Sequence, residues 1–506
     1  MKKVVETSMK TYFKLRSYRI DLMKKTAVES QDLLLVELLQ AATATEFGRD
    51  HDFEHISSYE DFNTKVPITS YEDLEPSIRR IMAGEQDVLW PGVIHNFSKS
   101  SGTTNDISKY LPVSHESLYG NNYQAGRDLY TIIFSSYPDI KIFENYGSVL
   151  SLGGSFVLTE DGAKVGDVSA IIMSELPRWA ERHREPSIDI ALLPDWKSKI
   201  PAIIEETIGK NITHLSGVPT WFVSLFEELR KEKPYQNLRE VWPNLELFIH
   251  GAVAFTPYRS IFETLLPFDD MKYVEVYNAS EGFFAIQDDP LKPGEMLLLT
   301  DHGIFYEFVP MDDYGSEHPA SISLHGVEVG VNYAMIITTS AGLWRYDLGD
   351  TVMFTSTDPY RIKITGRTKH FINVFGEELM VGNADEAIAR VSAETGAVVS
   401  HYTAGPIFMN DQGRGGHEWV IEFTKVPADV DAFTRLLDET LRSLNSDYDA
   451  KRQDDIALQI LKLNIVPEGT FMSWMESRGK LGGQHKVPRL SNKRDYIEQL
   501  LDLAKK

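Results

Sequence analysis

The apolar residues of this chain follow a helical pattern near the N-terminus and form short strand-like runs further on. Residues 5–46 are predicted to be helical, because leucines recur there at helical spacing and form one buried face. The leucines of this face are Leu33, Leu34, Leu35, Leu38 and Leu39. Later apolar runs that end at turn residues predict strands within residues 211–217, 245–251 and 273–277. The first of them continues through a turn at residues 217–219 into a helical stretch, as a βα unit does.

The pattern also predicts elements in the middle and at the end of the chain. Ser114 begins a predicted helix over residues 114–130, and residues 149–157 are predicted to be a strand with a close backbone approach at Gly153 and Gly154. From about residue 383 onward we expect a smaller α+β domain. Its helices are predicted at residues 384–394 and 428–445, and its strands at residues 419–423 and 456–465.

The length, net charge and residue composition of the chain narrow the class of protein. A chain of 506 residues exceeds the usual limit of one core, so two or more domains are expected. The net charge of −23 argues against partners that are nucleic acid or anionic membrane. The absence of cysteine excludes disulfides, thiolate metal sites and a catalytic thiol. There is no apolar run of membrane-spanning length and no secretory signal, so a cytoplasmic location is expected. The oligomeric state, monomer or dimer, stays open.

One segment, residues 97–112 with the sequence FSKSSGTTNDISKYLP, has the composition of a phosphate-binding loop. Small residues let backbone N–H groups approach a ligand closely, and hydroxyls add further donors. The small residues in question are Ser100, Ser101, Gly102, Thr103 and Thr104. Lys109 follows and supplies a mobile positive charge. Taken alone, such a cluster is more often an ordinary polar loop between strands.

Four further segments carry polar residues after strands or glycine turns. They are YVEVYNASEGFFAIQ at residues 273–287, LWRYDLGD at 343–350, ITGRTKHFINVFGEEL at 364–379 and GGQHKVPR at 482–489. Open α/β sheets bind ligands at the carboxyl ends of their strands, so the first segment is a candidate site. Arg127, on the predicted helix, could bind a substrate carboxylate through a bidentate fork, although a solvated or salt-bridged arginine is the commoner case.

Together these segments resemble the motifs of the acyl-adenylate-forming superfamily. Within it, YxxSEG, RYDLGD and QxKxPR are most similar to the auxin-responsive acyl acid amido synthetase family, and we expect a bacterial-type member. The similarity runs from about residue 30 to the C-terminus. It implies an α/β fold with a large multi-layer N-terminal domain, residues 1–372, that includes a small β-barrel-like part. A smaller mobile α+β domain, residues 373–506, would follow.

The resemblance also implies roles for the matching residues. Gly251 and Ala252 would pack against adenine together with Tyr277, and Ser280 would meet the α-phosphate. Glu281 would hold Mg²⁺, Asp350 would bind ribose, and Arg367 would contact ribose or phosphate. Lys486 would contact the acyl carboxylate and the α-phosphate, although a surface lysine is an equal alternative. The implied catalytic residues are therefore Lys109, Glu281 and Lys486, and the implied nucleotide site holds the small residues of the 97–112 segment, Gly251, Ala252, Tyr277, Asn278, Ala279, Ser280, Asp350 and Arg367.

The implied reaction uses ATP and Mg²⁺ to convert a small-molecule carboxylic acid into an acyl-adenylate. An amine, expected to be an amino acid, then takes the acyl group. Two alternatives share part of this chemistry: an acyl-CoA ligase, and a degenerate nucleotide- or acyl-binding protein. The second alternative rests on Asp106 and Glu378, which depart from the family pattern in the phosphate loop and in the 364–379 segment.

Overall fold

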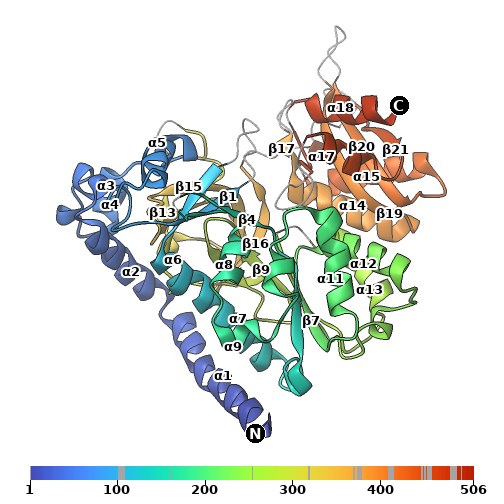
Figure 1. The fold of residues 1–506 in the computed structure, drawn as a ribbon. Coiled ribbons are helices and arrows are strands. Elements are labelled where there is room, and N and C mark those ends of the chain that lie inside the picture. The colour runs from blue at the N-terminus through green and yellow to red at the C-terminus, as the bar shows by residue number, and fades with distance from the viewer. Residues whose placement is uncertain are drawn as a thin grey trace. The chain divides into compact units, whose positions relative to one another are not determined.

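The structure is a computed structural model, and its chain is divided into two compact units (Figure 1). The first unit comprises Met1–Val253, Ile261–Leu348 and Val352–Lys363, and the second comprises Ala254–Ser260, Gly349–Thr351 and Ile364–Lys506. The structure describes residues 2–100, 109–160, 162–252, 255–316, 319–368, 371–372, 379–407, 415–445, 448–449, 452, 458–478, 487–491 and 493–505.

The helices of the N-terminal two thirds of the chain run from α1 to α13. They are α1 (Lys2–Lys25), α2 (Ala27–Ala42), α3 (Glu46–Asp50), α4 (Tyr59–Lys65), α5 (Tyr71–Met82), α6 (His115–Ser117), α7 (Tyr123–Ser136), α8 (Val168–Ser174), α9 (Arg178–Glu181), α10 (Ile188–Ala191), α11 (Trp196–Thr207), α12 (Pro219–Glu232) and α13 (Arg259–Leu265). A π-helical turn, η2 (Leu118–Asn122), joins α6 to α7. The 3₁₀ turns are η1 (Phe53–His55), η3 (Glu144–Tyr146), η4 (Leu238–Glu240), η5 (Thr256–Tyr258) and η6 (Leu324–Gly326).

A twelve-stranded sheet runs through this part of the chain, in the order β13-β12-β14-β15-β16-β11-β10-β9-β8-β7-β3-β6. Its strands are β3 (Ser148–Ser151), β6 (Arg184–Glu185), β7 (Ile212–Gly217), β8 (Leu247–Gly251), β9 (Lys272–Asn278), β10 (Phe283–Ile286), β11 (Met296–Leu298), β12 (Ile304–Pro310), β13 (Ile322–Ser323), β14 (Asn332–Thr339), β15 (Tyr346–Thr357) and β16 (Tyr360–Arg367). The pairs from β6 to β9 are parallel, whereas β9-β10, β10-β11, β11-β16, β12-β14 and β12-β13 are antiparallel. A second sheet has the order β2-β1-β5-β4, with β1 (Asn96–Ser100), β2 (Lys109–Val113), β4 (Phe156–Leu158) and β5 (Lys164–Gly166).

Helices cover both faces of the parallel strands, because successive side chains of a buried strand point to opposite sides. On one face, Ile249 of β8 and Val274 of β9 pack with Ile133 of α7, and α1 packs against α7 (Figure 1). On the other face, Phe248 of β8 stacks on Phe262 of α13, with the ring centroids 4.6 Å apart. This three-layer arrangement confirms the expected α/β fold class for the large part of the chain. The antiparallel strands extend the same sheet. The small β-barrel-like part, to which no residues were assigned, stays a prediction.

The second unit is a smaller α+β assembly. Its elements are β17 (Phe371–Ile372), β18 (Leu379–Met380), α14 (Val381–Thr395), β19 (Val398–Ile407), β20 (Gly416–Lys425), α15 (Val430–Leu444), β21 (Lys462–Val466), α17 (Thr470–Ser477) and α18 (Asp495–Ala504). The three-stranded sheet β19-β20-β21 is antiparallel between β19 and β20 and parallel between β20 and β21. Trp419 of β20 packs with α14 and α15, and its neighbour Val420 packs with α17 and α18, so helices cover both faces.

Three predictions differ from the structure in detail. Leu33 is 66% exposed, because it lies on the outer side of α2 while its neighbour Leu35 is buried. The predicted strand at residues 149–157 is two strands, β3 and β4, separated by Gly153 and Gly154. The predicted strand at residues 456–465 begins at Lys462, after a single bridge at Leu458 within the described part. Among the described residues, no helix combines the length and the apolar character of a membrane span.

Candidate active site

The carboxyl ends of four parallel strands lie along one edge of the large sheet. Ser151 of β3 pairs with Ser216 of β7, and Gly251 of β8 pairs with Val276 of β9. The four strands are neighbours in the order β9-β8-β7-β3, so the turns that follow them meet at this edge. Such an edge is where open α/β sheets bind ligands. The structure thus brings together the residues predicted after β8 and after β9.

Gly251 and Ala252, the predicted adenine-facing residues, form the turn after β8. Gly251 is buried, and a Cβ atom there would lie 2.5 Å from the carbonyl oxygen of Val276 on the neighbouring strand. Close packing of the two strands therefore accounts for the glycine. Ala252 is exposed and has φ +68°, a left-handed conformation that costs alanine of order 1 kcal/mol. Backbone strain of this kind tends to occur at functional sites.

The turn between β9 and β10 presents the predicted phosphate and metal residues. The N–H of Ala279 donates to the carbonyl of Gly282 at 2.8 Å, which leaves Ser280 and Glu281 at the tip of a tight turn. Ser280 is buried and Glu281 is half-buried. Asn278 pairs with Phe283 at the base of this turn.

Tyr277, the predicted adenine-stacking residue, points into the core of the first unit. It is 5% exposed, and its ring lies 4.8 Å from that of Phe284. The predicted role of Tyr277 toward adenine stays a prediction.

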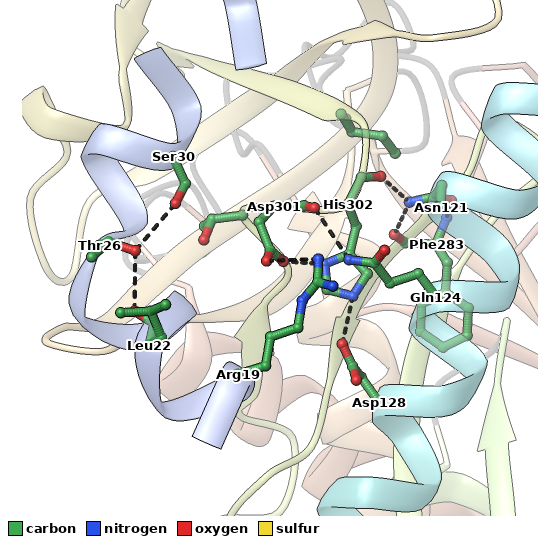
Figure 2. A network of polar contacts seen from close by, with 12 residues as sticks. Arg19, Leu22, Thr26, Ser30, Asn121, Gln124, Asp128, Phe283, Asp301 and His302 are labelled. Carbon is green, nitrogen blue, oxygen red and sulfur yellow. Dashed lines mark hydrogen bonds and ion pairs between the residues drawn. The ribbon is translucent and has the colours of Figure 1, made fainter. Parts of the chain in front are cut away.

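Asn121 holds this turn from the π-helical segment η2, a contact that the sequence analysis missed. Its side-chain oxygen accepts from the N–H of Phe283 at 2.7 Å, and its Nδ2 donates to the carbonyl oxygens of Phe283 and His302, each at 2.9 Å (Figure 2). The helix predicted from Ser114 is thus interrupted by a π turn that aims an asparagine inward. Such turns are frequent at functional sites. The pair Asn121-Asn122 inside a helical stretch was the available signal.

The predicted phosphate loop connects β1 to β2. Ser100 and Lys109 are the last paired residues of this hairpin, so they flank the loop. Ser101, Gly102, Thr103 and Thr104 lie outside the described residues, as does Asp106.

Lys109 is held beside Tyr71 of α5. The Nζ atom of Lys109 lies 5.3 Å from the centre of the Tyr71 ring, and the next residue, Tyr110, donates its N–H to the Tyr71 hydroxyl at 3.0 Å. Tyr71 begins α5, and a capping box between Ser70 and Asp73 closes the N-terminus of this helix.

Tyr346 links this hairpin to the β9–β10 turn. Burial raises the pKa of the Tyr346 hydroxyl well above its usual value, and the Glu281 carboxylate raises it further. Tyr71 acts on the same hydroxyl, more weakly. The carboxylates of Asp347 and Glu72 also raise the pKa of Tyr346, so this buried hydroxyl faces several acidic side chains, among them Glu281.

Arg345, directly before Tyr346, is a second residue whose role the sequence analysis missed. Its Nε donates to both carboxylate oxygens of Glu307 at 3.1 Å, and its Nη2 donates to the side-chain oxygen of Asn63 at 2.6 Å. Both side chains of the ion pair are almost completely buried. Arg345 also has φ +45°. A rigid, bidentate ion pair thus supports the backbone that carries Tyr346 and Asp347. The Tyr314 hydroxyl donates to Asp347 at 2.6 Å, so this carboxylate also has a partner in the fold.

In the second unit, the predicted ribose ligands contact each other. The Nε atom of Arg367 lies 3.0 Å from Oδ1 of Asp350, whose side chain is 9% exposed. Gly349 has φ +77°, and its carbonyl accepts from the N–H of Thr368 at 2.9 Å. The glycine turn predicted before Asp350 is therefore present. The arginine satisfies part of the carboxylate and leaves part of the guanidinium exposed.

Arg127, the predicted carboxylate anchor, is exposed on α7, while its neighbour Asp128 is buried. Its guanidinium makes no hydrogen bond or ion pair with the described residues, and its role stays a prediction. Lys486 and Glu378 lie outside the described residues. No cluster of three or more potential metal-binding side chains occurs in the described part of the chain.

Three family models match the chain in succession. The GH3 family N-terminal domain covers residues 16–271, the central domain covers residues 297–367, and the C-terminal domain covers residues 382–495. Among curated relatives, the indole-3-acetic acid-amido synthetase GH3.4 of Arabidopsis thaliana is 24% identical over 91% of this chain and 88% of its own. The 4-substituted benzoates-glutamate ligase GH3.12 of the same species is 24% identical over 91% and 92%.

Solved structures show the same fold. A GH3.15 acyl acid amido synthetase superposes with a TM-score of 0.81 at 16% identity, over 97% of this chain and 96% of its own. A 2-hydroxyisobutyryl-CoA ligase gives a TM-score of 0.60 at 14% identity, over 94% and 91%. The curated relatives named above are plant proteins, and the expectation of a bacterial-type member stays a prediction. The resemblance inferred from the motifs is confirmed: this chain belongs to the GH3 family, the family of the acyl acid amido synthetases.

Proposed function

We propose that this protein is an ATP-dependent ligase that joins a carboxylic acid to the amine of an amino acid. The observation that carries the proposal is the match of the GH3 N-terminal, central and C-terminal domains, in order, to residues 16–271, 297–367 and 382–495. The substrate carboxylate attacks the α-phosphate of ATP and releases pyrophosphate. The amine then attacks the acyl carbon of the adenylate, forms the amide bond and releases AMP together with a proton.

Most of the residues assigned to the first step belong to the first unit. Ser100 and Lys109 flank the loop that binds the phosphates, and the Lys109 ammonium neutralises their charge. Gly251, Ala252 and Tyr277 take the adenine, and the tight turn after β9 offers the Ser280 hydroxyl to the α-phosphate. Nucleotidyl transfer requires alignment and charge neutralisation rather than a protein nucleophile, and this set of side chains contains no cysteine. Arg127 is assigned to the acid substrate.

The nucleotide and its metal are assigned from the donor types present. Mg²⁺ is usually held by one or two carboxylates together with substrate phosphates, so the single carboxylate of Glu281 fits such a site without a dedicated cluster. When bound, Mg²⁺ neutralises phosphate charge. In the second unit, the carboxylate of Asp350 accepts from ribose hydroxyls and Arg367 holds that carboxylate in place. Lys486 is assigned to the acyl carboxylate and the α-phosphate.

We assign the roles of the two domains as the sequence predicts them. Residues 1–372 bind ATP and the acid, and residues 373–506 form a smaller mobile domain that excludes water from the adenylate. A cytoplasmic location is part of the same proposal. The acyl-CoA ligase alternative is weaker, because the family models that match are those of GH3, while the likeness to a CoA ligase is one of fold. A degenerate binding protein remains the alternative if Asp106 and Glu378 impair phosphate binding.

The test is pyrophosphate release from Mg·ATP with a panel of acids that includes indole-3-acetate and 4-hydroxybenzoate. Each acid is assayed alone, with pooled amino acids and with CoA. Release that depends on an acid, with an amide as the product, is expected. Thioester formation with CoA would replace the proposal by the ligase alternative, and ATP binding without release would favour a degenerate site.

Two variants test the site assignment in the same assay. Glu281→Ala and Asp350→Ala are each expected to abolish most acid-dependent pyrophosphate release, because each removes a carboxylate that binds ATP or its metal. Lys210→Ala is a matched control: this lysine pairs with Glu185 at 3.1 Å on an exposed surface and should leave release unchanged. Normal release in both carboxylate variants would show that the nucleotide binds elsewhere.

A further inference from the structure

Lys199 is a buried lysine whose ammonium binds backbone carbonyls instead of a carboxylate. It lies in the first turn of α11 and is 1% exposed. Its Nζ donates to the carbonyl oxygen of Gly153 at 2.7 Å and to that of Gly154 at 3.1 Å. No carboxylate of the described residues forms an ion pair with it. Burial lowers its pKa to about 8, against which Asp167 acts in the opposite direction. Keeping a lysine in such a place is costly, so a specific reason for it is expected.

The same segment is held from the other side by the N–H groups of Gly154 and Ser155. Ser169 Oγ accepts from the N–H of Gly154 at 3.1 Å, and Asp167 Oδ2 accepts from the N–H of Ser155 at 2.9 Å. A Cβ atom on Gly154 would lie 1.6 Å from that Asp167 oxygen, so any other residue there would displace the Asp167 side chain. The segment of residues 152–155, called here the β3 turn, is thus clamped between Lys199 on its carbonyl side and the start of α8 on its amide side.

The β3 turn lies at the sheet edge of the candidate site, beside the turn that follows β7. The N–H of Leu152 donates to the carbonyl of Ser216 at 3.0 Å. A Cβ atom on Gly217 would lie 2.8 Å from the carbonyl oxygen of Leu152, so the two turns touch through their backbones. The β3 turn therefore lies next to the end of β7 at this edge of the sheet.

Two tryptophan rings lie between the Lys199 ammonium and the turn that follows β7, called here the β7 turn. The Nζ of Lys199 lies 5.3 Å from the centre of the Trp196 ring, and that ring lies 5.2 Å from the ring of Trp221, near the start of α12. Because α12 begins directly after the β7 turn, Lys199 is connected to both turns at this edge.

We propose that Lys199 is a positioning residue that fixes the β3 turn as a wall of the acid-binding site and so determines which acids fit. This inference rests on the proposed ligase function. Adenine and phosphate are assigned to the turns after β8 and β9, so the neighbouring turns after β3 and β7 are the part of the edge left for the acyl group. Lys199 does not touch the acid, because its ammonium is buried behind the two glycines. It acts by holding their carbonyl oxygens away from the acid.

The first experiment needs no substrate. Hydrogen–deuterium exchange of the backbone amides in residues 152–156 is compared in the wild type, Lys199→Met and Lys24→Met. Loss of charge-assisted bonds to two carbonyls should speed exchange in Lys199→Met by about tenfold. Lys24 is a matched control, since it is a partly buried lysine of the same unit that pairs with Asp288 at 2.7 Å. Unchanged exchange in Lys199→Met would show that Lys199 does not hold the β3 turn in place.

The second experiment measures KM for the accepted acid and for ATP by pyrophosphate release. Lys199→Met should raise the KM of the acid by about tenfold and alter the ranking of acids, while the KM of ATP stays within about twofold. Ser169→Ala removes a hydrogen bond on the amide side of the same turn, so it should also raise the KM of the acid. This variant replaces Lys199→Met in the test if Lys199→Met does not fold. Equal shifts for acid and ATP, or no shift for either, would overturn the acid-site role. If the wild type activates no acid, that role falls with the proposed function, whereas the exchange result still decides the clamp.

Discussion

Asn121 and Phe283 exchange a reciprocal pair of hydrogen bonds, in which the asparagine amide accepts from the backbone N–H and donates to the backbone carbonyl of the same residue. Phe283 directly follows the turn that carries Ser280 and Glu281. A side chain from one helix thus completes the backbone hydrogen bonding at the start of β10. The position of the predicted metal-binding carboxylate therefore depends on a residue far away in the sequence.

Replacing Asn121 by alanine should impair both stability and adenylation. The change leaves the buried N–H and carbonyl of Phe283 without their partner, at a cost of about 1–3 kcal/mol for each unsatisfied group. We expect a lower thermal midpoint and a fall in acid-dependent pyrophosphate release that persists at temperatures where the variant is fully folded. Asn122→Ala is the matched control, because the side chain of Asn122 makes only a long hydrogen bond of 3.4 Å with the described residues, to the carbonyl of Ser117. Equal effects of the two variants would contradict the prediction.

The buried pair of Arg345 and Glu307 predicts a strongly non-additive pair of variants. Arg345→Met leaves the Glu307 carboxylate buried without its counter-ion, which typically costs about 3–5 kcal/mol. Changing both residues to methionine removes the uncompensated charge, so the double variant should regain much of the stability. The measurement is the urea midpoint of the wild type, both single variants and the double variant. A double variant less stable than Arg345→Met would refute the conclusion that Arg345 stabilises the fold by neutralising the buried Glu307 carboxylate.

The elements of this protein were largely predictable from local pattern. Strand β7 with its turn and α12, and strand β8 up to Gly251, follow from spacing and turn chemistry, and both are present. Local pattern failed for elements whose conformation depends on contacts between residues far apart in the sequence. Strand β19 escaped prediction, and the helix predicted from Ser114 contains a π turn because Asn121 bonds to Phe283. The same limit applies to the site.

Motifs identified the ligand-facing candidates, but they could not reveal the residues that hold them. Glu307 under Arg345 and Lys199 under Gly153 are single residues within ordinary apolar or helical stretches. Their partners lie far away in the sequence, so only the folded chain shows the pairing. Burial of a charged group is the physical sign of such a residue, and a single sequence carries no direct measure of it.

His302 predicts a pH dependence of stability. Its Nε2 lies 2.9 Å from Oδ2 of Asp128 and its Nδ1 lies 2.7 Å from Oδ1 of Asp301, an ion-pair contact with poor hydrogen-bond geometry (Figure 2). Burial alone lowers the pKa of His302, but the two carboxylates outweigh it and raise the pKa above 6.5. Arg16 and Arg19 of α1 pair with Asp128 and Asp301.

Because the folded-state pKa is raised, the protonated His302 stabilises the fold fully below pH 6.5, and this contribution is lost as the pH rises through the folded-state value. The wild type should therefore exceed His302→Gln in unfolding free energy most at pH 6 and least at pH 9. Urea unfolding of both proteins at the two pH values measures the difference. A difference that is constant or grows with pH would mean that His302 is neutral in the folded protein.

Arg489 predicts an energetic link to the lysine of the C-terminal motif. Its Nη2 donates to the hydroxyl of Tyr258 at 2.5 Å, and its guanidinium lies 4.5 Å from the centre of the Tyr402 ring. The Arg489 carbonyl accepts from the N–H of Ala404 at 2.8 Å, so the segment is docked on β19. Lys486 shortly precedes this docked arginine in the sequence. If Lys486 acts in catalysis, Arg489 and Tyr258 set where that lysine can reach.

Tyr258→Phe removes one hydroxyl and should lower acid-dependent turnover by about tenfold, the loss expected for one hydrogen bond to a charged group. In the Lys486→Ala background the same change should have no further effect on turnover, because there is no lysine left to position. Tyr402→Phe is the control: it keeps the ring beside Arg489 and removes the hydrogen bond to Asp385. Multiplying effects of Tyr258→Phe and Lys486→Ala would show that the tyrosine acts independently of the lysine. A Lys486→Ala variant with normal turnover would instead remove Lys486 from the catalytic residues and leave the ligase function itself intact.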